Sequence, residues 1–333
     1  MYRLYFVFAI FSLAAIICKD VFAGTPEGTS IISFHGYSGC VKLDNGEVSV
    51  ILDPNCGGRV LEYSLNGENL IYLDPEQDGW MLSPDGKTID PCGGRFDIGP
   101  EMTAPRHPQL WLGKWTAEIT GSRKARLTSI ADKSTGVQLI RDFELDKKTS
   151  HLRCTQIIKN VSDETKYYFH WGRTFAVGNG ICLIPLTPNS RFPKSYILHG
   201  PGWLINPDPP EQPNVEVRDG FFIIKGEPVM PQYDLDTYAG WFAYITRSNL
   251  IFVKKFPMYP ERLYGEVNCS TVVAWYNKTQ MCELEPIGPK EQIKPGKSVS
   301  YTEDWWLFPY QYPADGNADL QDVTKLVKKN AKK

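Results

Sequence analysis

The sequence lacks an excess of charge of either sign, and it lacks the common motifs of nucleotide- and metal-dependent enzymes. Its 36 basic and 38 acidic side chains leave a formal net charge of −2, so we expect no nucleic-acid partner. No CxxC or HExxH pattern occurs, and the phosphate-loop, dinucleotide-binding and Gly-x-Ser-x-Gly motifs are absent as well. These absences argue against zinc sites, nucleotide enzymes and serine hydrolases, and we expect neither a metal nor a cofactor. The alternative is calcium at an acidic loop such as residues 234–236, although no segment has the spacing of a known calcium loop.

Long apolar runs are also missing, except at the N-terminus. Arg3 is followed by an apolar stretch over Leu4–Cys18, and Val21-Phe22-Ala23 offers a cleavage site before Gly24. This arrangement is typical of a secretory signal peptide, and the stretch is short for a membrane span. We therefore expect a signal peptide at residues 1–23, no membrane span after cleavage, and a secreted, periplasmic or extracellular location. A retained signal anchor is the alternative.

Removal of that leader would leave an odd number of cysteines. The chain contains eight cysteines, and Cys18 lies within the expected signal peptide. An oxidising compartment permits disulfides, and Cys269 and Cys282 flank a segment typical of a β-hairpin. We expect these two to pair, which leaves at least one other cysteine free or paired outside the chain. The possible N-glycosylation triplets begin at Asn160, Asn268 and Asn277.

Most of the remaining chain consists of strand-like segments. Arg59–Leu65 and Asn69–Leu73 flank an Asn66-Gly67 turn, which is a hairpin signal, and Val137–Leu145 continues the pattern. Further strands are expected at residues 47–52, 115–120, 151–160, 166–175, 221–225, 240–246, 250–256, 271–276, 282–287 and 298–307. This succession predicts an all-β fold, a large antiparallel β-sandwich that forms a single domain over residues 24–333.

One helix is expected, near the C-terminus. Its apolar residues recur at helical spacing, at Leu320, Val323, Leu326 and Val327. The candidates for its N-cap are Asp315, Asn317 and Asp319. The helix belongs to a C-terminal tail that starts at about residue 314. Proline-rich segments at residues 185–193 and 201–213 are expected to be loops that are long enough to cover a binding face.

Two glutamates on one strand are the first sign of a functional site. In the segment Met281–Pro309, Glu283 and Glu285 are separated by one residue, so both project from the same face of a strand. Neighbouring carboxylates repel each other, which raises a carboxyl pKa toward the range of a general base at neutral pH. A cleft or a ligand accommodates such a pair, and exposure on an edge strand is the alternative.

Short motifs follow one another along the chain. They are Cys56-Gly57-Gly58-Arg59 with Asn66-Gly67 beyond it, Cys92-Gly93-Gly94-Arg95 followed by Arg106-His107-Pro108, Tyr168-Phe169-His170-Trp171-Gly172-Arg173, and Glu283-Leu284-Glu285-Pro286. Over about residues 45–308, this ordered set resembles the galactose mutarotase-like (aldose 1-epimerase-like) superfamily, and within it the secreted, largely uncharacterised members.

The resemblance implies a β-supersandwich with a sugar-binding cleft on its concave sheet. Aldose mutarotases of that superfamily use a glutamate as base and a histidine as acid. Carried over by position, the base would be Glu285, with Glu283 as the competing candidate, and the acid would be His170. The residues that would hold the sugar are Arg95, His107, Glu283, and Asp234 or Asp236.

Several candidates also have a structural interpretation. His170 lies in an aromatic run and could line the core, and Arg95 could be a salt-bridged turn residue. Sugar rings stack on exposed indoles, so the tryptophans near loops are candidates, although most of the nine are expected in the core. These loop candidates are Trp111, Trp203 and Trp241.

The sequence therefore predicts a secreted carbohydrate-binding protein whose partner is a sugar or an oligosaccharide. The enzymatic version is an aldose 1-epimerase-like isomerase. The alternatives are a non-catalytic glycan-binding module, and a polysaccharide lyase or hydrolase in which the two carboxylates act as a glycosidase pair.

Overall fold

The computed structural model describes residues 25–84, 87–200, 204–277 and 280–331. The expected signal peptide at residues 1–23 and one candidate tryptophan, Trp203, lie outside this part of the chain. Within it, no helix combines the length and the apolar character that a membrane crossing requires.

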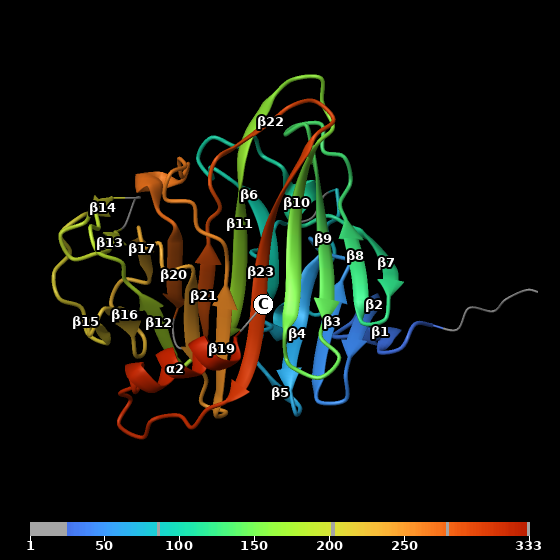
Figure 1. The fold of residues 1–333 in the computed structure, drawn as a ribbon. Helices are drawn as coiled ribbons and strands as arrows, with labels where there is room; N and C mark the ends of the chain where they lie inside the picture. The colour runs from blue at the N-terminus through green and yellow to red at the C-terminus, as the bar shows by residue number, and fades with distance from the viewer. Residues whose placement is uncertain (1–24, 85–86, 201–203, 278–279, 332–333) are drawn as a thin grey trace, which may run out of the picture.

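Two antiparallel sheets pack face to face (Figure 1). The larger sheet contains, in spatial order, β1 (Thr29–Phe34), β2 (Tyr37–Asp44), β3 (Val48–Asp53), β4 (Arg59–Leu65), β6 (Gly94–Gly99), β11 (Lys166–Val177), β21 (Met281–Pro286), β20 (Val272–Asn277), β17 (Gln232–Leu235), β13 (Ile197–His199) and β14 (Ile205–Asn206), while β5 (Glu68–Asn69) pairs with β4 and β22 (Glu291–Ile293) pairs with β11. The smaller sheet contains β15 (Val215–Arg218), β16 (Phe221–Ile224), β12 (Ile181–Pro185), β18 (Trp241–Ile245), β19 (Leu250–Lys255), β23 (Ser298–Pro309), β10 (Leu152–Asn160), β9 (Val137–Leu145), β8 (Lys124–Thr128) and β7 (Thr116–Gly121). The helical segments are η1 (Pro75–Gln77), α1 (Pro108–Trp111), η3 (Val267–Cys269) and α2 (Leu320–Asn330).

The core lies between the two sheets because apolar and polar residues alternate along the strands. In β9 and β10, every second side chain is buried. The apolar ones among these side chains join inward-facing residues of the larger sheet, such as Val60, Phe96 and Leu284, in one hydrophobic cluster. Each fully buried aliphatic or aromatic side chain contributes about 1.5–3 kcal/mol. The predicted antiparallel β-sandwich is therefore confirmed.

Helix α2 begins where its capping residue predicts. The side chain of Asp319 accepts hydrogen bonds from the backbone N–H groups of Gln321 and Asp322, which are unsatisfied within the helix itself. The buried face of the helix packs on the outer side of the smaller sheet, against residues of β12, β18 and β19 (Figure 1). The short C-terminal helix expected from the sequence is thus present.

A charged pair lies within the core between the two sheets. Nζ of Lys254 in β19 lies 2.9 Å from Oε2 of Glu303 in β23, and neither side chain is exposed. Lys254 also donates to Oγ1 of Thr174 in the larger sheet at 2.8 Å, and the indole N–H of Trp305 donates to Glu303 at 2.9 Å. Gly172 leaves room for this network, since a Cβ there would lie 1.8 Å from Oε1 of Glu303. The pair and its hydrogen bonds tie the two sheets together.

Candidate functional site

Charged side chains from three central strands gather on the outer face of the larger sheet. Arg95 of β6 is paired in register with Arg173 of β11, and β21 lies on the other side of β11. Nη2 of Arg95 lies 3.4 Å from Oε1 of Glu283 in β21, and Nε of Arg173 lies 2.7 Å from the same oxygen. Asp90 forms a further ion pair with Arg95 at 2.8 Å. Glu283 therefore faces two guanidinium groups.

Glu285 occupies the same face, two residues further along β21. Its Oε2 accepts a hydrogen bond from the indole N–H of Trp171 and lies 3.5 Å from Nε of Arg173. Burial and the neighbouring Glu283 carboxylate raise the pKa of Glu285 well above its ordinary value, although Arg173 and the Trp171 bond oppose the rise. A carboxyl group with a raised pKa can take up and release a proton nearer to neutral pH.

The adjacent strands continue this face with an aspartate and a histidine. Nε2 of His199 in β13 lies 3.1 Å from Oδ2 of Asp234 in β17, and Oγ of Ser270 donates to the same oxygen at 3.0 Å. Burial lowers the pKa of His199, but the ion pair with Asp234 outweighs it, so this pKa is raised overall. Val273 of β20 lies between Asp234 and Glu285 in register. The two carboxylates are thus two strand spacings, roughly 10 Å, apart along the sheet.

Several buried polar atoms on this face have no hydrogen-bond partner among the described residues. They are Oδ1 of Asp234, Nε1 of Trp275 and Oε2 of Glu283. Trp275 of β20 is paired in register with Glu283 on one side and with Gln232 of β17 on the other, so all three atoms come from neighbouring strands. A buried polar group without a partner is destabilising by about 1–3 kcal/mol, which a ligand could relieve.

We use the name outer-face site for a set of residues from β6, β11, β21, β20, β17 and β13. They are Arg95, Arg173, Glu283, Glu285, Trp275, Asp234 and His199. Across the described part of the chain, no group of three or more His, Cys, Asp or Glu side chains has a geometry suited to a metal ion. The arrangement is instead one of carboxylates, guanidinium groups and an indole N–H, which together suit a ligand with many hydroxyl groups.

His107 lies near this face, immediately before α1. Its Nε2 lies 2.8 Å from Oδ1 of Asp97, which is two residues beyond Arg95 on β6. Its Nδ1 contacts the carbonyl oxygen of Pro105. Burial lowers the pKa of His107, but the hydrogen bond and ion pair with Asp97 outweigh it and raise the pKa to about 9. His107 therefore carries a positive charge at neutral pH.

Asp97→Asn is expected to lower the pKa of His107 from about 9 to its ordinary value near 6.5 or below. Asparagine keeps an acceptor but removes the charge that holds the proton. NMR titration of the imidazole measures the change, and His107→Gln identifies the signal. Because the folded-state pKa is raised, the stabilisation from this pair is complete below about pH 6.5 and is lost as the pH rises through about 9. An unchanged titration in Asp97→Asn would contradict this assignment.

His170 lies on the other side of the sheet, in the core. Neighbouring residues of a strand face opposite sides, so Trp171 reaches Glu285 while His170 points between the two sheets. Its fully buried ring stacks between Phe96 and Tyr301, with centroid distances of 5.7 Å to each. Burial lowers the pKa of His170 to about 3, so the ring is neutral near pH 7. The prediction of His170 as the acid partner of Glu285 disagrees with this placement, whereas a core histidine fits it.

Trp241 also lies away from the outer-face site. It begins β18 in the smaller sheet and packs edge-on against Phe221 in the cluster that α2 covers, with ring centroids 5.9 Å apart. Trp111 of α1 is nearer to the site, because the guanidinium carbon of Arg95 lies 6.0 Å from its ring centroid. Trp111 is therefore a better candidate than Trp241 for contact with a ligand.

Asp236, the other aspartate expected to hold the sugar, binds a loop of the protein instead. Its carboxylate accepts hydrogen bonds from Oγ of Ser190 at 2.6 Å and from the backbone N–H of Arg191 at 2.7 Å. It therefore anchors the proline-rich segment at residues 185–193. Of the two aspartates, Asp234 has the free oxygen on the outer face.

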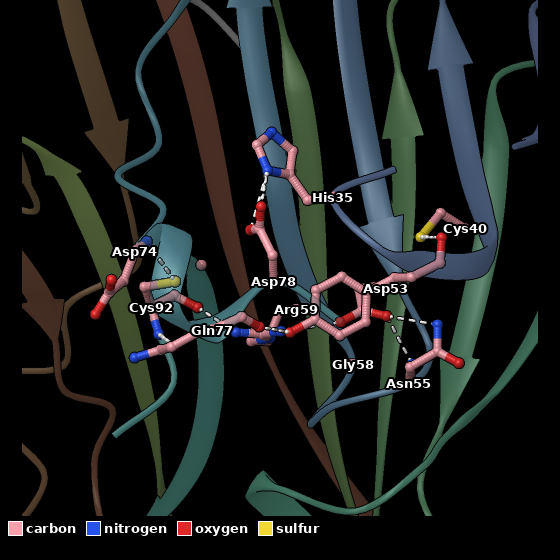
Figure 2. A network of polar contacts seen from close by, with 12 residues as sticks. His35, Cys40, Asp53, Asn55, Gly58, Arg59, Asp74, Gln77, Asp78 and Cys92 are labelled. Atoms are coloured by element: carbon pink, nitrogen blue, oxygen red, sulfur yellow. Dashed lines mark hydrogen bonds and ion pairs between the residues drawn. The ribbon is translucent and has the colours of Figure 1, made fainter. Parts of the chain in front are cut away.

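The arginine of the Cys56-Gly57-Gly58-Arg59 motif belongs to a separate structural network (Figure 2). Buried Arg59 forms an ion pair with Asp53 at 3.1 Å and donates to the carbonyl oxygen of Cys92 at 2.9 Å. Oε1 of Gln77 accepts from the backbone N–H of Cys92 at 2.9 Å, and Sγ of Cys92 accepts from the backbone N–H of Asp74 at 3.2 Å. This network ties β3 and β4 to the segment that precedes β6.

The predicted disulfide between Cys269 and Cys282 is wrong. Both cysteines are free, and Cys282 is paired in register with Tyr276, which lies well beyond Cys269 along the hairpin of β20 and β21. Cys282 also points into the core, whereas Cys269 packs with residues of the outer face. Of the possible glycosylation sites, Asn160 is buried and its amide donates to the carbonyl oxygens of Glu164 and Ile293, so it is not accessible.

Three residues of the site are missing from the sequence-based prediction: Arg173, Trp275 and His199. Arg173 could have been found, because it lies three residues after His170 in the same motif and therefore faces the opposite side of the strand. His199 and Trp275 have no local signal. Their neighbours Asp234 and Glu283 come from distant parts of the chain, and only the strand order brings them together.

No protein-family model and no curated protein matches the sequence. Among solved structures, the Slr1438 protein of Synechocystis sp. PCC 6803 is 16% identical, with a TM-score of 0.54 over 90% of this chain and 100% of that one. A galactose mutarotase-like protein from Clostridium acetobutylicum is 13% identical, with a TM-score of 0.54 over 86% of this chain and 100% of that one. A galactose mutarotase-like protein from Lactobacillus casei is 8% identical, with a TM-score of 0.55 over 81% and 100%. The chain therefore has the galactose mutarotase-like fold.

Proposed function

We propose that this protein is a secreted carbohydrate-binding protein that holds a sugar or an oligosaccharide at the outer-face site. The observation that carries the proposal is the group of three buried, unpartnered polar atoms on Asp234, Trp275 and Glu283. The galactose mutarotase-like fold supports it. The secreted location rests on the signal-like N-terminal sequence.

The chemistry of the site suits a neutral sugar. A hydroxyl group can donate to the carboxylate oxygens of Asp234 and Glu283 and accept from the indole N–H of Trp275. Hydrogen bonds to a charged partner are the stronger ones, which favours the carboxylates as anchors. Arg95 and Arg173 are both engaged by Glu283, so an anionic ligand would have to compete for them.

The enzymatic version of the proposal is the exchange of sugar anomers. Ring opening needs a base at the anomeric hydroxyl and an acid at the ring oxygen. Glu285 has the raised pKa that suits the base, and His199, whose pKa the ion pair with Asp234 raises, takes the role of acid in place of His170. Strands β20 and β17 separate the two residues, so a ring bound between them would meet acid and base from opposite sides.

A non-catalytic glycan-binding module is the second candidate. Trp171 and Arg173 both engage Oε2 of Glu285, which favours a fixed carboxylate over a mobile base. A glycan that binds at this site without any exchange of its anomers would support this version.

Trp275→Phe is expected to weaken sugar binding by up to about 10-fold. The substitution removes one hydrogen bond, worth about 0.5–1.5 kcal/mol, and keeps an aromatic ring. A glycan array identifies a ligand, and isothermal titration calorimetry compares the affinities. Trp241→Phe is the matched control and should leave the affinity unchanged, because Trp241 lies beneath α2. The absence of any bound glycan, or equal affinities for wild type and Trp275→Phe, would contradict the proposed site.

A further inference from the structure

Two buried cysteines lie where the chain crosses from one sheet to the other. Strand β11 of the larger sheet ends at Val177, and β12 of the smaller sheet begins at Ile181, so a short connection joins the sheets here. Cys182 follows at once in β12. Cys282 of β21 is paired in register with Ala176 of β11. The crossing therefore brings Cys182 close to the strand that carries Cys282.

Hydrogen bonds from two tyrosines hold this corner together. Tyr276, the register partner of Cys282, donates to the carbonyl oxygen of Gly180 at 3.1 Å. Tyr244, the register partner of Cys182, donates to the end of β11 at 2.7 Å and accepts from the backbone N–H of Gly180 at 2.9 Å. These bonds join the two sheets beside both cysteines. They therefore fix the distance between the strand that carries Cys182 and the strand that carries Cys282.

Both cysteine side chains point into the same core. Cys182 and Cys282 each have 0% exposed surface and belong to one hydrophobic cluster, and Cys182 is near enough to Cys282 to contribute to the rise of that thiol's pKa. Both are free thiols in the structure. A disulfide requires Cα atoms about 4.4–6.8 Å apart, and disulfides between the two sheets occur in other β-sandwiches. Burial raises the pKa of Cys282 well above its ordinary value, so this thiol is a poor nucleophile once the core has closed.

We propose that Cys182 and Cys282 form a disulfide between the two sheets when the chain folds in an oxidising compartment. The two thiols lose two protons and two electrons as the S–S bond forms. A disulfide such as oxidised glutathione, or the disulfide of an oxidoreductase, accepts them and is reduced to two thiols. The bond forms before the core closes, while the sulfur atoms are still accessible. This inference is independent of the proposed sugar site.

Peptide mapping of the full-length chain tests the bond. The protein is refolded in a buffer of reduced and oxidised glutathione, denatured, alkylated without reduction and digested. We expect a pair of peptides joined through Cys182 and Cys282 that is lost when a reductant is added before alkylation. Complete alkylation of both cysteines without reduction, or linkage of either one to a different cysteine, would overturn the proposal.

Two variants provide the controls. Cys282→Ala is expected to remove the joined peptides and to make Cys182 available for alkylation. Cys154→Ala is the matched control, because Cys154 is equally buried in the same core, and it should leave the link intact. Reduction is expected to lower the melting temperature of the wild type but not that of Cys282→Ala. If a variant fails to fold, the wild-type peptide map still tests the bond.

Discussion

Glu285→Gln is expected to lower the rate of anomer exchange by about 10²–10⁴-fold, the range that a general base contributes. Glutamine keeps the size of the side chain and an oxygen that can accept from Trp171, so sugar affinity should change little by comparison. What is lost is the carboxylate that takes the proton from the anomeric hydroxyl. Exchange of common aldoses, started from single anomers and followed by NMR against the spontaneous rate, measures the effect.

Glu283→Gln tests which of the two glutamates, Glu283 or Glu285, acts as the base. Glu283 accepts from Arg173 at 2.7 Å and faces Arg95 as well, so it is held as a positioning group and its loss should weaken binding more than exchange. A larger drop in rate for Glu283→Gln than for Glu285→Gln would reverse the assignment. Equal exchange rates in the wild type and Glu285→Gln would remove the enzymatic version and leave the binding module.

The pH dependence of the exchange rate is expected to follow Glu285. A base is active only when it is ionised, and burial together with Glu283 raises the pKa of Glu285. On the acidic side the rate should therefore rise with increasing pH, with a midpoint above the ordinary glutamate value of about 4.3, and it should fall again at higher pH as His199, the proposed acid, loses its proton. An exchange rate that has already reached its maximum at about pH 4 would be inconsistent with Glu285 as the base.

Glu303→Ala is expected to lower the free energy of unfolding by about 3–5 kcal/mol. The substitution leaves the ammonium group of Lys254 in the core without its partner at 2.9 Å, and it also removes the acceptor for Gln156 and Trp305. Burial already lowers the pKa of Lys254 while Glu303 opposes that shift. Loss of the carboxylate should therefore favour neutral lysine and lower this pKa further. Chemical denaturation measures the stability.

Glu144→Ala is the matched control for the core ion pair. Glu144 of β9 lies 2.8 Å from Nζ of Lys124 in β8, but 47% of each side chain is exposed. Solvent screens such a pair, so its loss should change the stability by about 1 kcal/mol or less. Lys254→Met combined with Glu303→Leu should recover part of the loss, since no buried charge then remains. If Glu303→Ala and Glu144→Ala lowered the free energy of unfolding by equal amounts, burial would not be what makes the Lys254–Glu303 pair important for stability.

The strands and the helix with strong local patterns could be predicted from the sequence. The strand expected at residues 137–145 coincides with β9, the hairpin of β20 and β21 lies where it was expected, and Asp319 caps α2. These features depend on side-chain alternation and on capping, which act over a few residues. Strand β6 was missed, because its segment Gly94–Gly99 contains two glycines and is stabilised as a strand by pairing with β11.

The amino-acid sequence was sufficient to predict the β-sandwich and the shared face of Glu283 and Glu285, because a two-residue period is a local property of a strand. It was not sufficient to predict which residues make up the outer-face site. Which face of β11 meets those glutamates, and therefore whether His170 or Arg173 joins them, depends on how the strand is placed between its neighbours. The pairing of His199 with Asp234 likewise follows from strand order, because contacts between distant segments exist only once the sheet has assembled.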